Sequence, residues 1–401
     1  MSRLILEHLP GVPVSQQRLE LVERKGLGHP DTLCDALMEA VSVALCQAYL
    51  AAAGRVLHYN LDKGLLVAGQ TTPALGGGRV EVPMRLIVGD RATLAWQGEP
   101  LPVAELVAET VRRWIGEHLR FVDPQHHLVL QNELRPGSPE LVDLFARQPL
   151  GANDTSAAVG YAPLTETERC VLAAERYLNS PAFKARFPET GEDVKIMGCR
   201  QERHLSLTVA LAFVDRFIPD ERTYFERKAA VAEALQRYLE GELRQLESVS
   251  VHLNTLDAPG RGLGGMYLTV LGTSAESGDG GQVGRGNRVN GVISLNRPAG
   301  SESAAGKNPV SHVGKIYSLL AHHLAERLYE ALEPVEEVYV WLCSQIGAPI
   351  DRPWVTSVQV RLAPGTGLYE VERPITDLVE AELANMPAFI ERLVHGAIPV
   401  W

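Results

Sequence analysis

The tetrapeptide Gly28-His29-Pro30-Asp31 stands directly before a long amphipathic segment and joins an imidazole to a carboxylate. Carboxylate oxygens are the hard ligands that Mg²⁺ prefers, and an imidazole can donate a hydrogen bond to a phosphate oxygen. A helix start adds unpaired backbone N–H groups and the positive end of the helix dipole, which both favour an anion. The segment therefore predicts a phosphate site with a metal ion at Asp31. The simpler alternative is that Asp31 only caps the helix.

Glycine and basic residues are concentrated later in the chain. Residues 260–291 hold 11 of the 36 glycines, and residues 285–315 hold five basic residues against one acidic residue, a net charge of +4. Since the whole chain carries −11, the remainder carries −15. Backbone N–H groups beside concentrated cations are typical of a phosphate cradle, and the alternative is a flexible surface loop. The five cations are Arg285, Arg288, Arg297, Lys307 and Lys315.

Two further segments carry residues that could do chemistry. The small-residue run 151–163 contains Asp154, and the run 191–198 places Asp193 and Lys195 two positions apart, which is one face of a predicted strand. The alternatives are a packed turn formed by Asp154 and a surface ion pair between Asp193 and Lys195.

The common nucleotide motifs are excluded. Gly260-x-Gly262-x-x-Gly265 matches the dinucleotide fingerprint, but that motif requires a following helix, and residues 266–271 predict a strand. Gly306-Lys307 is not part of a P-loop, because position 301 is serine rather than glycine and position 308 is asparagine. Any phosphate site in this chain is therefore assembled differently.

Helical and strand periodicities alternate along all 401 residues, which predicts the α/β (α+β) class and roughly two to four folding units. The predicted helices are 32–53, 102–118, 166–178, 220–246, 313–332 and 375–396, the third opening on a capping box at Thr165 and Glu168. The predicted strands are 55–59, 65–70, 80–88, 127–131, 204–214, 249–254, 266–271, 336–343 and 355–361.

Composition limits the function classes. Five cysteines without a C-x-x-C pair support neither a disulfide framework nor a zinc knuckle, which favours a reducing cytoplasmic location. No window approaches 18 uninterrupted apolar residues, so no membrane-spanning segment is predicted. A net charge of −11 disfavours broad attraction to nucleic acid or anionic membranes.

Six blocks between residues 28 and 353 together resemble one family. They are GHPD, GANDTSAAVGYAPLTETE, GEDVKIMG, GTSAESGDGGQVGRGNRVNG, GKNPVSHVGKIY and SQIGAPIDRP. In this order they resemble the archaeal-type S-adenosylmethionine synthetases (methionine adenosyltransferases, AdoMet synthase family 2). The resemblance implies that ATP, L-methionine and water give S-adenosylmethionine, phosphate and diphosphate, with Mg²⁺ and often K⁺.

The resemblance also implies an architecture. It predicts one synthetase unit of three interleaved α/β subdomains with pseudo-threefold symmetry, with approximate segments 1–150, 151–265 and 266–401. It further predicts a homodimer, or a dimer of dimers, with active sites at the subunit interface.

Site residues follow from matching motifs. The predicted catalytic residues are His29, Lys195, Arg285 and Lys307, with Asp31 holding the metal ion. The predicted residues for binding ATP or methionine are Gln70, Gly137, Ser138, Asp154, Asp193, Asp279, Arg288, His312 and Lys315. Segment 131–140 is interpreted as a mobile cover or, alternatively, an ordinary Pro-Gly turn. Two departures from the bacterial pattern are Gly286, which replaces a second basic residue, and Gln70, which replaces a glutamate.

The implied chemistry is a direct displacement in which the methionine sulfur attacks the ribose 5′ carbon and the whole triphosphate leaves. The triphosphate carries roughly four negative charges, so cations placed around it lower the barrier most. Two alternatives are an ATP-dependent small-molecule kinase and a catalytically silent nucleotide-binding regulatory subunit.

Overall fold

The structure is a computed structural model that describes residues 4–138, 145 and 151–401. Its mixed α/β architecture confirms the predicted class and is built on three larger sheets. Sheet A has the order β1 (Ile5–His8), β18 (Val355–Leu362), β17 (Val335–Cys343), β10 (Ala157–Ala162). Sheet B has the order β13 (Ser248–Leu253), β12 (His204–Val214), β11 (Thr190–Gln201), β2 (Leu19–Lys25), β16 (Ile293–Ser294), with β14 (Leu268–Thr269) beside β12. Sheet C has the order β15 (Gly281–Gln282), β3 (Tyr59–Val67), β6 (Met84–Ala92), β9 (Leu128–Arg135).

Helices cover one face of each sheet. The helices on sheet C are α1 (Pro30–Ala53) and α2 (Val103–His118), those on sheet B are α4 (Glu166–Leu178) and α6 (Glu221–Glu242), and those on sheet A are α7 (Val313–Ala331) and α8 (Leu368–Ala384). Helix α5 (Pro181–Arg186) packs against α4, and α9 (Met386–Val394) packs against α1 and α8. Small hairpins pair β4 (Gln70–Thr72) with β5 (Arg79–Val82) and β7 (Ala95–Trp96) with β8 (Glu99–Pro100). All six predicted helices are confirmed, the last of them as the pair α8 and α9.

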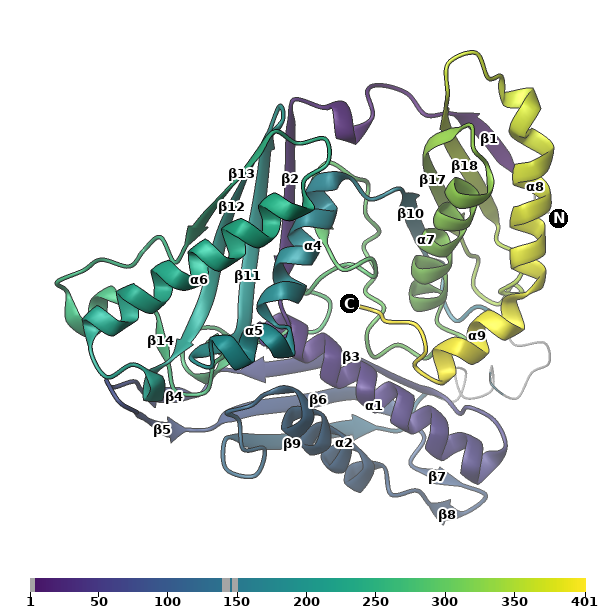
Figure 1. Cartoon of the computed structure of the whole chain (residues 1–401). Coiled ribbons are helices and arrows are strands. Elements are labelled where there is room, and N and C mark those ends of the chain that lie inside the picture. The colour runs from purple at the N-terminus through teal and green to yellow at the C-terminus, as the bar shows by residue number, and fades with distance from the viewer. Residues whose placement is uncertain (1–3, 139–144, 146–150) are drawn as a thin grey trace.

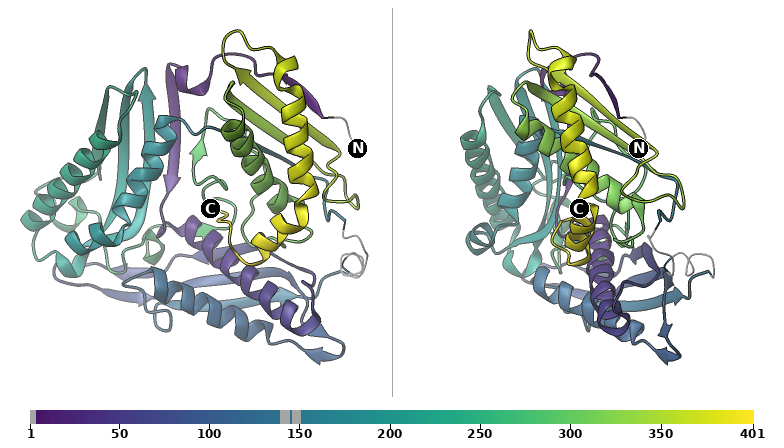
Figure 2. Two further views of the ribbon diagram at one scale, coloured as in Figure 1. Left: turned by 45° about the vertical axis from the view of Figure 1, so that its right-hand side comes forward. Right: turned by 90° about the vertical axis from the view of Figure 1, so that its right-hand side faces the viewer.

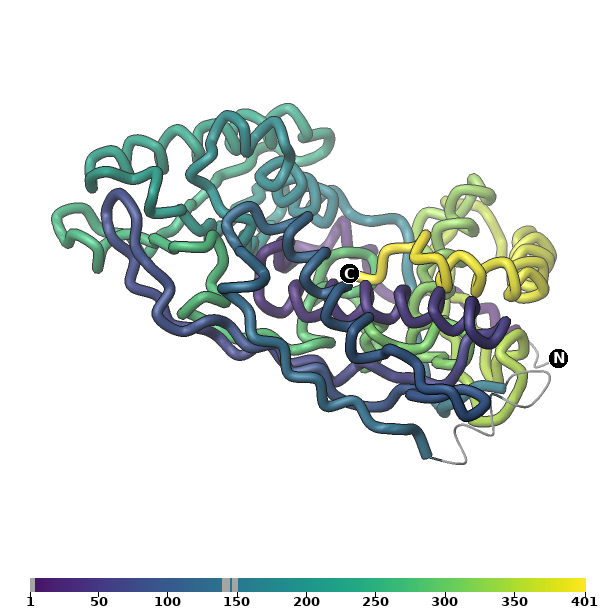
Figure 3. Tube along the Cα trace, turned by 90° about the horizontal axis from the view of Figure 1, so that it is seen from below, coloured from purple at the N-terminus to yellow at the C-terminus, as the bar shows by residue number. Residues whose placement is uncertain are grey.

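The three sheet-and-helix units surround a common centre. Figure 1 shows sheet B with α4 and α6 on one side, sheet A with α7 and α8 on the other, and sheet C with α1 and α2 below. The C-terminus lies between the three units (Figure 1), and the turned views keep α1 between the strands of sheet C and helix α9 (Figure 2). Seen from below, α1 runs beside the C-terminal helix α9, with which it is in contact (Figure 3).

Each sheet draws its strands from distant parts of the sequence. Strand β1 pairs in parallel with β18, β2 pairs antiparallel with β11, and β15 pairs antiparallel with β3. The contiguous segments 1–150, 151–265 and 266–401 therefore do not coincide with the three sheets.

Several strands differ from the sequence prediction. Strands β1, β2 and β10 were not predicted, and β11 runs over twelve residues where a short strand was expected. The strand expected at 266–271 is reduced to the two residues of β14. A short 3₁₀ helix, Gly262–Gly265, ends at the last glycine of the dinucleotide-like motif and is followed by β14, which confirms that the motif is not a dinucleotide fingerprint.

Helix α1 is a core helix. Leu33, Leu37, Val41 and Leu45 are all buried within its first sixteen residues. Its length and its mean hydropathy of 1.5 would also allow it to span a membrane, although no membrane-spanning segment was predicted from the sequence. In this fold it packs against β3 and α2 inside the molecule.

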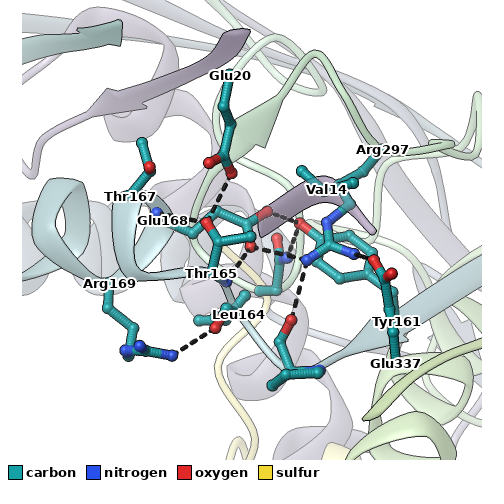
Figure 4. Close-up of polar contacts among 12 residues, drawn as sticks. Val14, Glu20, Tyr161, Leu164, Thr165, Thr167, Glu168, Arg169, Arg297 and Glu337 are labelled. Carbon is teal, nitrogen blue, oxygen red and sulfur yellow. Dashed lines mark hydrogen bonds and ion pairs between the residues drawn. The ribbon is translucent and has the colours of Figure 1, made fainter. Parts of the chain in front are cut away.

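A buried ionic network connects sheet A to sheet B (Figure 4). The guanidinium of Arg297 contacts Glu337 on β17 and lies 3.3 Å from the carboxylate of Glu168 on α4. The hydroxyl of Thr165 donates to Glu20 on β2 (2.6 Å). Thr165 and Glu168 also form the predicted capping box, which is confirmed. Because all five side chains are buried, the network fixes the two sheets to each other.

Candidate active site

Helix α1 begins against strand β11, where glycine allows the two backbones to touch. The amide of Gly28 donates to the carbonyl of Glu192 (2.9 Å). A Cβ atom at position 28 would lie 2.5 Å from the backbone nitrogen of Asp193, so only glycine fits there. This contact places the start of α1 next to Asp193 and Lys195.

His29 is the N-cap of α1. Its Nδ1 accepts a hydrogen bond from the amide of Asp31 (3.2 Å), so the alternative in which Asp31 caps the helix is wrong. Because Nδ1 accepts, the neutral ring carries its proton on Nε2 and can donate from there. Burial lowers the pKa of His29 to about 4. The positive charge of Lys25 also lowers this pKa, whereas the negative charge of Asp31 opposes the shift. The ring is therefore neutral at physiological pH.

A group of charges surrounds this imidazole, and we call it the α1 N-terminal cluster: Lys25, His29, Asp31, Lys195 and Asp279. Lys25 Nζ lies 2.9 Å from Asp31 Oδ2, and Lys195 stands directly opposite Lys25 in the ladder between β2 and β11. All four other charges act on the pKa of His29. The structure thus brings together residues from three separate sequence motifs.

Asp193 lies beside this cluster and is almost fully buried. Its Oδ2 accepts from the amide (2.8 Å) and the hydroxyl (2.6 Å) of Ser274, and burial raises its pKa to about 6. A register shift in the ladder between β11 and β12, on the N-terminal side of Val194, accompanies this placement. The alternative of a surface ion pair between Asp193 and Lys195 is wrong, because Lys195 pairs with Glu23 (3.5 Å).

Three carboxylates spaced four residues apart line one face of α1: Asp31, Asp35 and Glu39. Each accepts a backbone amide from the glycine-rich and basic region. The donors are Gln282 to Asp31 (3.0 Å), Gly284 to Asp35 (2.7 Å) and Gly306 to Glu39 (3.0 Å). The predicted phosphate cradle is wrong at these three positions, because their backbone amides donate to carboxylates of α1 instead of facing a phosphate. The flexible-loop alternative is also wrong for the anchored residues.

Lys315 lies further along the same interface. Its Nζ contacts both carboxylate oxygens of Glu39 (2.7 and 2.8 Å), and its side chain is only 1% exposed. The pair joins α7 to α1. A contact between Lys315 and a triphosphate would require this pair to open.

A second charged group surrounds the start of α7, and we call it the α7 N-terminal cluster: Asp62, Lys63, Glu302, Lys307 and His312. Lys307 Nζ lies 2.5 Å from Asp62 Oδ2 and 3.2 Å from Glu302 Oε2. His312 caps α7 as His29 caps α1, with its Nδ1 accepting from the amide two residues later (3.2 Å). Burial lowers the pKa of His312 to about 3, and Lys307 acts in the same direction.

The remaining predicted residues lie outside the two clusters. Arg285 is exposed, and its carbonyl accepts a hydrogen bond from Lys25 Nζ of the α1 N-terminal cluster (2.6 Å). For the other five, no hydrogen bond or ion pair in the described residues leads to either cluster. Gln70 is exposed at the start of β4, Gly137 packs against His58, Ser138 is exposed, and Arg288 lines a cavity. Asp154 is half-buried next to Asn153, whose amide donates to the carbonyl of Ser311 (3.1 Å), so its segment approaches the start of α7. Residues 139–140 of the interpreted cover lie outside the described residues.

Sequence reasoning missed several of the charges. Lys25, Asp35, Glu39 and Asp62 were not singled out, although each binds a predicted site residue or the region that carries one. The available signal was the spacing of Asp31, Asp35 and Glu39 on an otherwise apolar helix, because buried carboxylates require partners. Lys25 and Asp62 gave no comparable signal, since isolated charged residues in strands are usually solvated.

No group of three or more His, Cys, Asp or Glu side chains in the described residues forms a metal cage. This is compatible with Mg²⁺, which often takes one or two carboxylates and completes its shell with water and substrate phosphates. Asp31 and Asp279 are the carboxylates beside His29. Asp31 already accepts from Gln282 and Lys25, but each of its oxygens has a second lone pair. The residues present therefore fit Mg²⁺.

Lysines and neutral, helix-capping histidines gathered among carboxylates form a site of the kind that suits enzymes with anionic substrates. The sequence matches the family described as "S-adenosylmethionine synthetase (AdoMet synthetase)" over residues 2–397. The chain belongs to this family.

Named relatives are similar over nearly their whole length. The chain is 44% identical to a "Probable S-adenosylmethionine synthase" of Aquifex aeolicus over 392 residues, which cover 96% of each chain. It is 44% identical to the "S-adenosylmethionine synthase" of Pyrococcus furiosus over 403 residues, 99% of each chain. It is 44% identical to that of Aeropyrum pernix over 407 residues, 100% of this chain and 99% of the relative.

One solved structure supports the fold. It is the "Unusual S-adenosylmethionine synthetase from Campylobacter jejuni", with a TM-score of 0.57 and 17% identity over 93% of this chain and 88% of that chain. The family and the relatives identify the activity as that of a methionine adenosyltransferase, a transferase of S-adenosylmethionine biosynthesis. Neither the kinase nor the silent regulatory subunit is supported.

Proposed function

We propose that this chain joins ATP and L-methionine at the surface formed by the two N-terminal clusters and hydrolyses the released triphosphate with water, so that S-adenosylmethionine, phosphate and diphosphate leave. The observation that carries this location is the convergence of Lys25, His29 and Lys195 at the start of α1. A thioether is already nucleophilic, so the protein needs no general base. Its task is to stabilise the negative charge that the leaving triphosphate gains.

The proposed roles follow from charge and exposure. Lys195 and Arg285 are exposed, so their charges can reach a triphosphate directly. His29 donates from Nε2 to a phosphate oxygen, since its Nδ1 is used by the helix. Lys307 is held between Asp62 and Glu302, so a contact between Lys307 and the substrate would require these ion pairs to open. A charge at about 4 Å contributes on the order of 4 kcal/mol at an effective dielectric near 20, before desolvation costs.

The other binding assignments are proposals of the same kind. Asp193 fixes the loop that carries Ser274 and so shapes the nucleotide side of the site. Asp154 lies near the start of α7 and is suited to the methionine ammonium. Gln70 is neutral and exposed, and it contributes a hydrogen bond rather than a charge.

Mg²⁺ is the proposed cofactor, held by Asp31 and Asp279 together with the phosphates. When bound, it neutralises phosphate charge. K⁺ remains a prediction from the resemblance, and the cytoplasmic location is a proposal supported by five free cysteines.

A homodimer with interfacial sites is proposed from the open face of sheet C. Leu65, Val67 and Val129 are 42%, 42% and 43% exposed, and the strand registers place them on one face, opposite the side chains that pack under α1 and α2. Exposed apolar side chains on a sheet face favour an interaction surface. Arg85, which the registers place between Val67 and Val129, adds a charge to this face.

The test of function is incubation with Mg-ATP and methionine. S-adenosylmethionine formed in equal amount to phosphate and to diphosphate supports the proposal. Formation of ADP without methionine would support a kinase, and binding without turnover would support a silent subunit; either result would overturn the proposal.

A further inference from the structure

Asp35 lies one helical turn beyond Asp31 and is 2% exposed. Its Oδ1 accepts from the amide of Gly284 (2.7 Å), and the amide of Gly286 is a second donor. Burial raises the pKa of Asp35 to about 7, while these two amides stabilise the ionised form. A buried carboxylate that serves only backbone amides holds a loop in one place.

The loop alternates between anchored and outward-facing residues. Gln282 and Gly284 donate to Asp31 and Asp35, whereas the Arg285 side chain is exposed and its carbonyl accepts from Lys25 Nζ (2.6 Å). Arg285 is therefore fixed on both sides by hydrogen bonds that lead back to the start of α1.

Position 286 has no room for a side chain. A Cβ atom there would lie 2.1 Å from Asp35 Oδ2 and 3.6 Å from the carbonyl oxygen of Asp31. This explains why glycine stands where the bacterial pattern has a second basic residue: the space is taken by the carboxylate that anchors the loop.

We propose that Asp35 is a positioning residue: its carboxylate fixes segment 282–286 to helix α1 and thereby sets the place of Arg285. The inference rests on the proposed contact between Arg285 and the triphosphate. A misplacement of about 1 Å can cost on the order of a hundredfold in rate. Asp35 itself touches no substrate in this account.

The first test is structural and independent of activity. In Asp35→Asn, one acceptor oxygen becomes an NH₂ group that faces an amide donor, so hydrogen exchange across residues 281–288 is expected to accelerate at least about tenfold. Glu166→Gln is the matched control, because Glu166 is also buried and accepts the amides of Arg244 (2.6 Å) and Gln245 (2.8 Å) far from this loop. Unchanged exchange in Asp35→Asn overturns the proposal even if the enzyme is inactive.

The second test is a double-mutant cycle on S-adenosylmethionine formation. Asp35→Asn is expected to lower kcat at least about tenfold, Arg285→Ala about a hundredfold, and the double variant no more than Arg285→Ala alone. Multiplied losses, or a kcat of Asp35→Asn within twofold of the wild type, contradict the proposal. If Asp35→Asn does not fold, Gly286→Ala takes its place, because a methyl group at position 286 displaces the same loop. The same changes in hydrogen exchange and kcat then support or contradict the proposal. A wild type without synthetase activity would refute the proposed function and leave the exchange test decisive.

Discussion

At the scale of single residues, the ring of His29 combines a structural contact with a chemical one. Nδ1 accepts a hydrogen bond from the backbone amide of Asp31, which leaves the proton on Nε2 available for the proposed contact with phosphate. Because its pKa is about 4, the neutral ring can make the proposed hydrogen bond without adding charge or requiring protonation.

His29→Asn separates the two contacts. Asparagine is a good N-cap, so the variant keeps the helix start but loses the Nε2 donor. We expect kcat to fall about a hundredfold, the scale of one lost preorganised donor. The melting temperature is expected to stay within about 2 °C of the wild type. Steady-state kinetics and calorimetry measure the two; near-normal turnover would refute the role of Nε2.

Lys184 is a buried cation that the proposed chemistry does not use. Its Nζ donates to the carbonyl of Gly191 (2.5 Å) and lies 3.3 Å from the hydroxyl of Thr190, so it supports the start of β11. Burial lowers the pKa of Lys184 to about 7 from an ordinary 10.5, although Glu192 opposes the shift.

The depressed pKa predicts how stability depends on pH. Between about pH 7 and 10 the unfolded chain binds a proton at Lys184 that the folded chain does not hold, so the free energy of unfolding rises with pH. The slope is at most about 1.4 kcal/mol per pH unit. Below pH 7 both states are protonated and this residue adds no slope. Lys184→Met is expected to lack the rise, as measured by urea unfolding at pH 7, 8 and 9. Equal slopes in both proteins would contradict the prediction.

At the scale of elements, glycine decides how β10 meets α7. A Cβ atom on Gly160 would lie 2.1 Å from the backbone nitrogen of His322 and 2.2 Å from the carbonyl carbon of Ala321, so strand and helix touch through their backbones. Close packing requires small residues, and this explains why β10 was not predicted. Its sequence AAVGYA consists mostly of small residues, whereas strands are recognised by β-branched ones. The missed β2 is interrupted by charges that pair only in the folded chain.

Gly160→Ala is expected to lower the free energy of unfolding by about 1–3 kcal/mol, the usual effect of overpacking. Gly241→Ala is the matched control, because Gly241 lies in α6 with nothing within 4 Å of a new Cβ atom. There alanine is expected to stabilise by up to about 1 kcal/mol, because it favours the helix. Urea midpoints measure both changes, and equal effects would contradict the close contact.

At the scale of the whole molecule, the arrangement depends on pairings between distant segments. Strand β1 closes sheet A beside β18, and the buried contacts of Arg297 join that sheet to sheet B. Helices thus cover one face of each of the three sheets. The other face of sheet C carries exposed apolar side chains.

Leu65→Glu tests the proposed dimer. Burying a carboxylate at the interface costs desolvation energy that leucine does not, so the variant is expected to run at half the mass of the wild type and to lose activity. Val12→Glu is the control, since Val12 is 58% exposed and lies between β1 and β2, away from sheet C. Light scattering after gel filtration gives the masses. A monomeric wild type, or a dimeric Leu65→Glu variant, would refute the proposed interface.

The sequence by itself determined the fold class, the six helices and, through its motifs, the family, because periodicity, caps and motif spacing are local properties of the chain. It also placed His29, Asp31, Lys195 and Asp279 in motifs without showing that they form one cluster. Only the tertiary structure decided that His29, not Asp31, is the cap. It also decided that the amides of Gln282 and Gly284 bind α1 and that Lys315 is buried against Glu39. These outcomes depend on which distant segments pair and on how a buried charge finds its partner, and neither is encoded in local pattern.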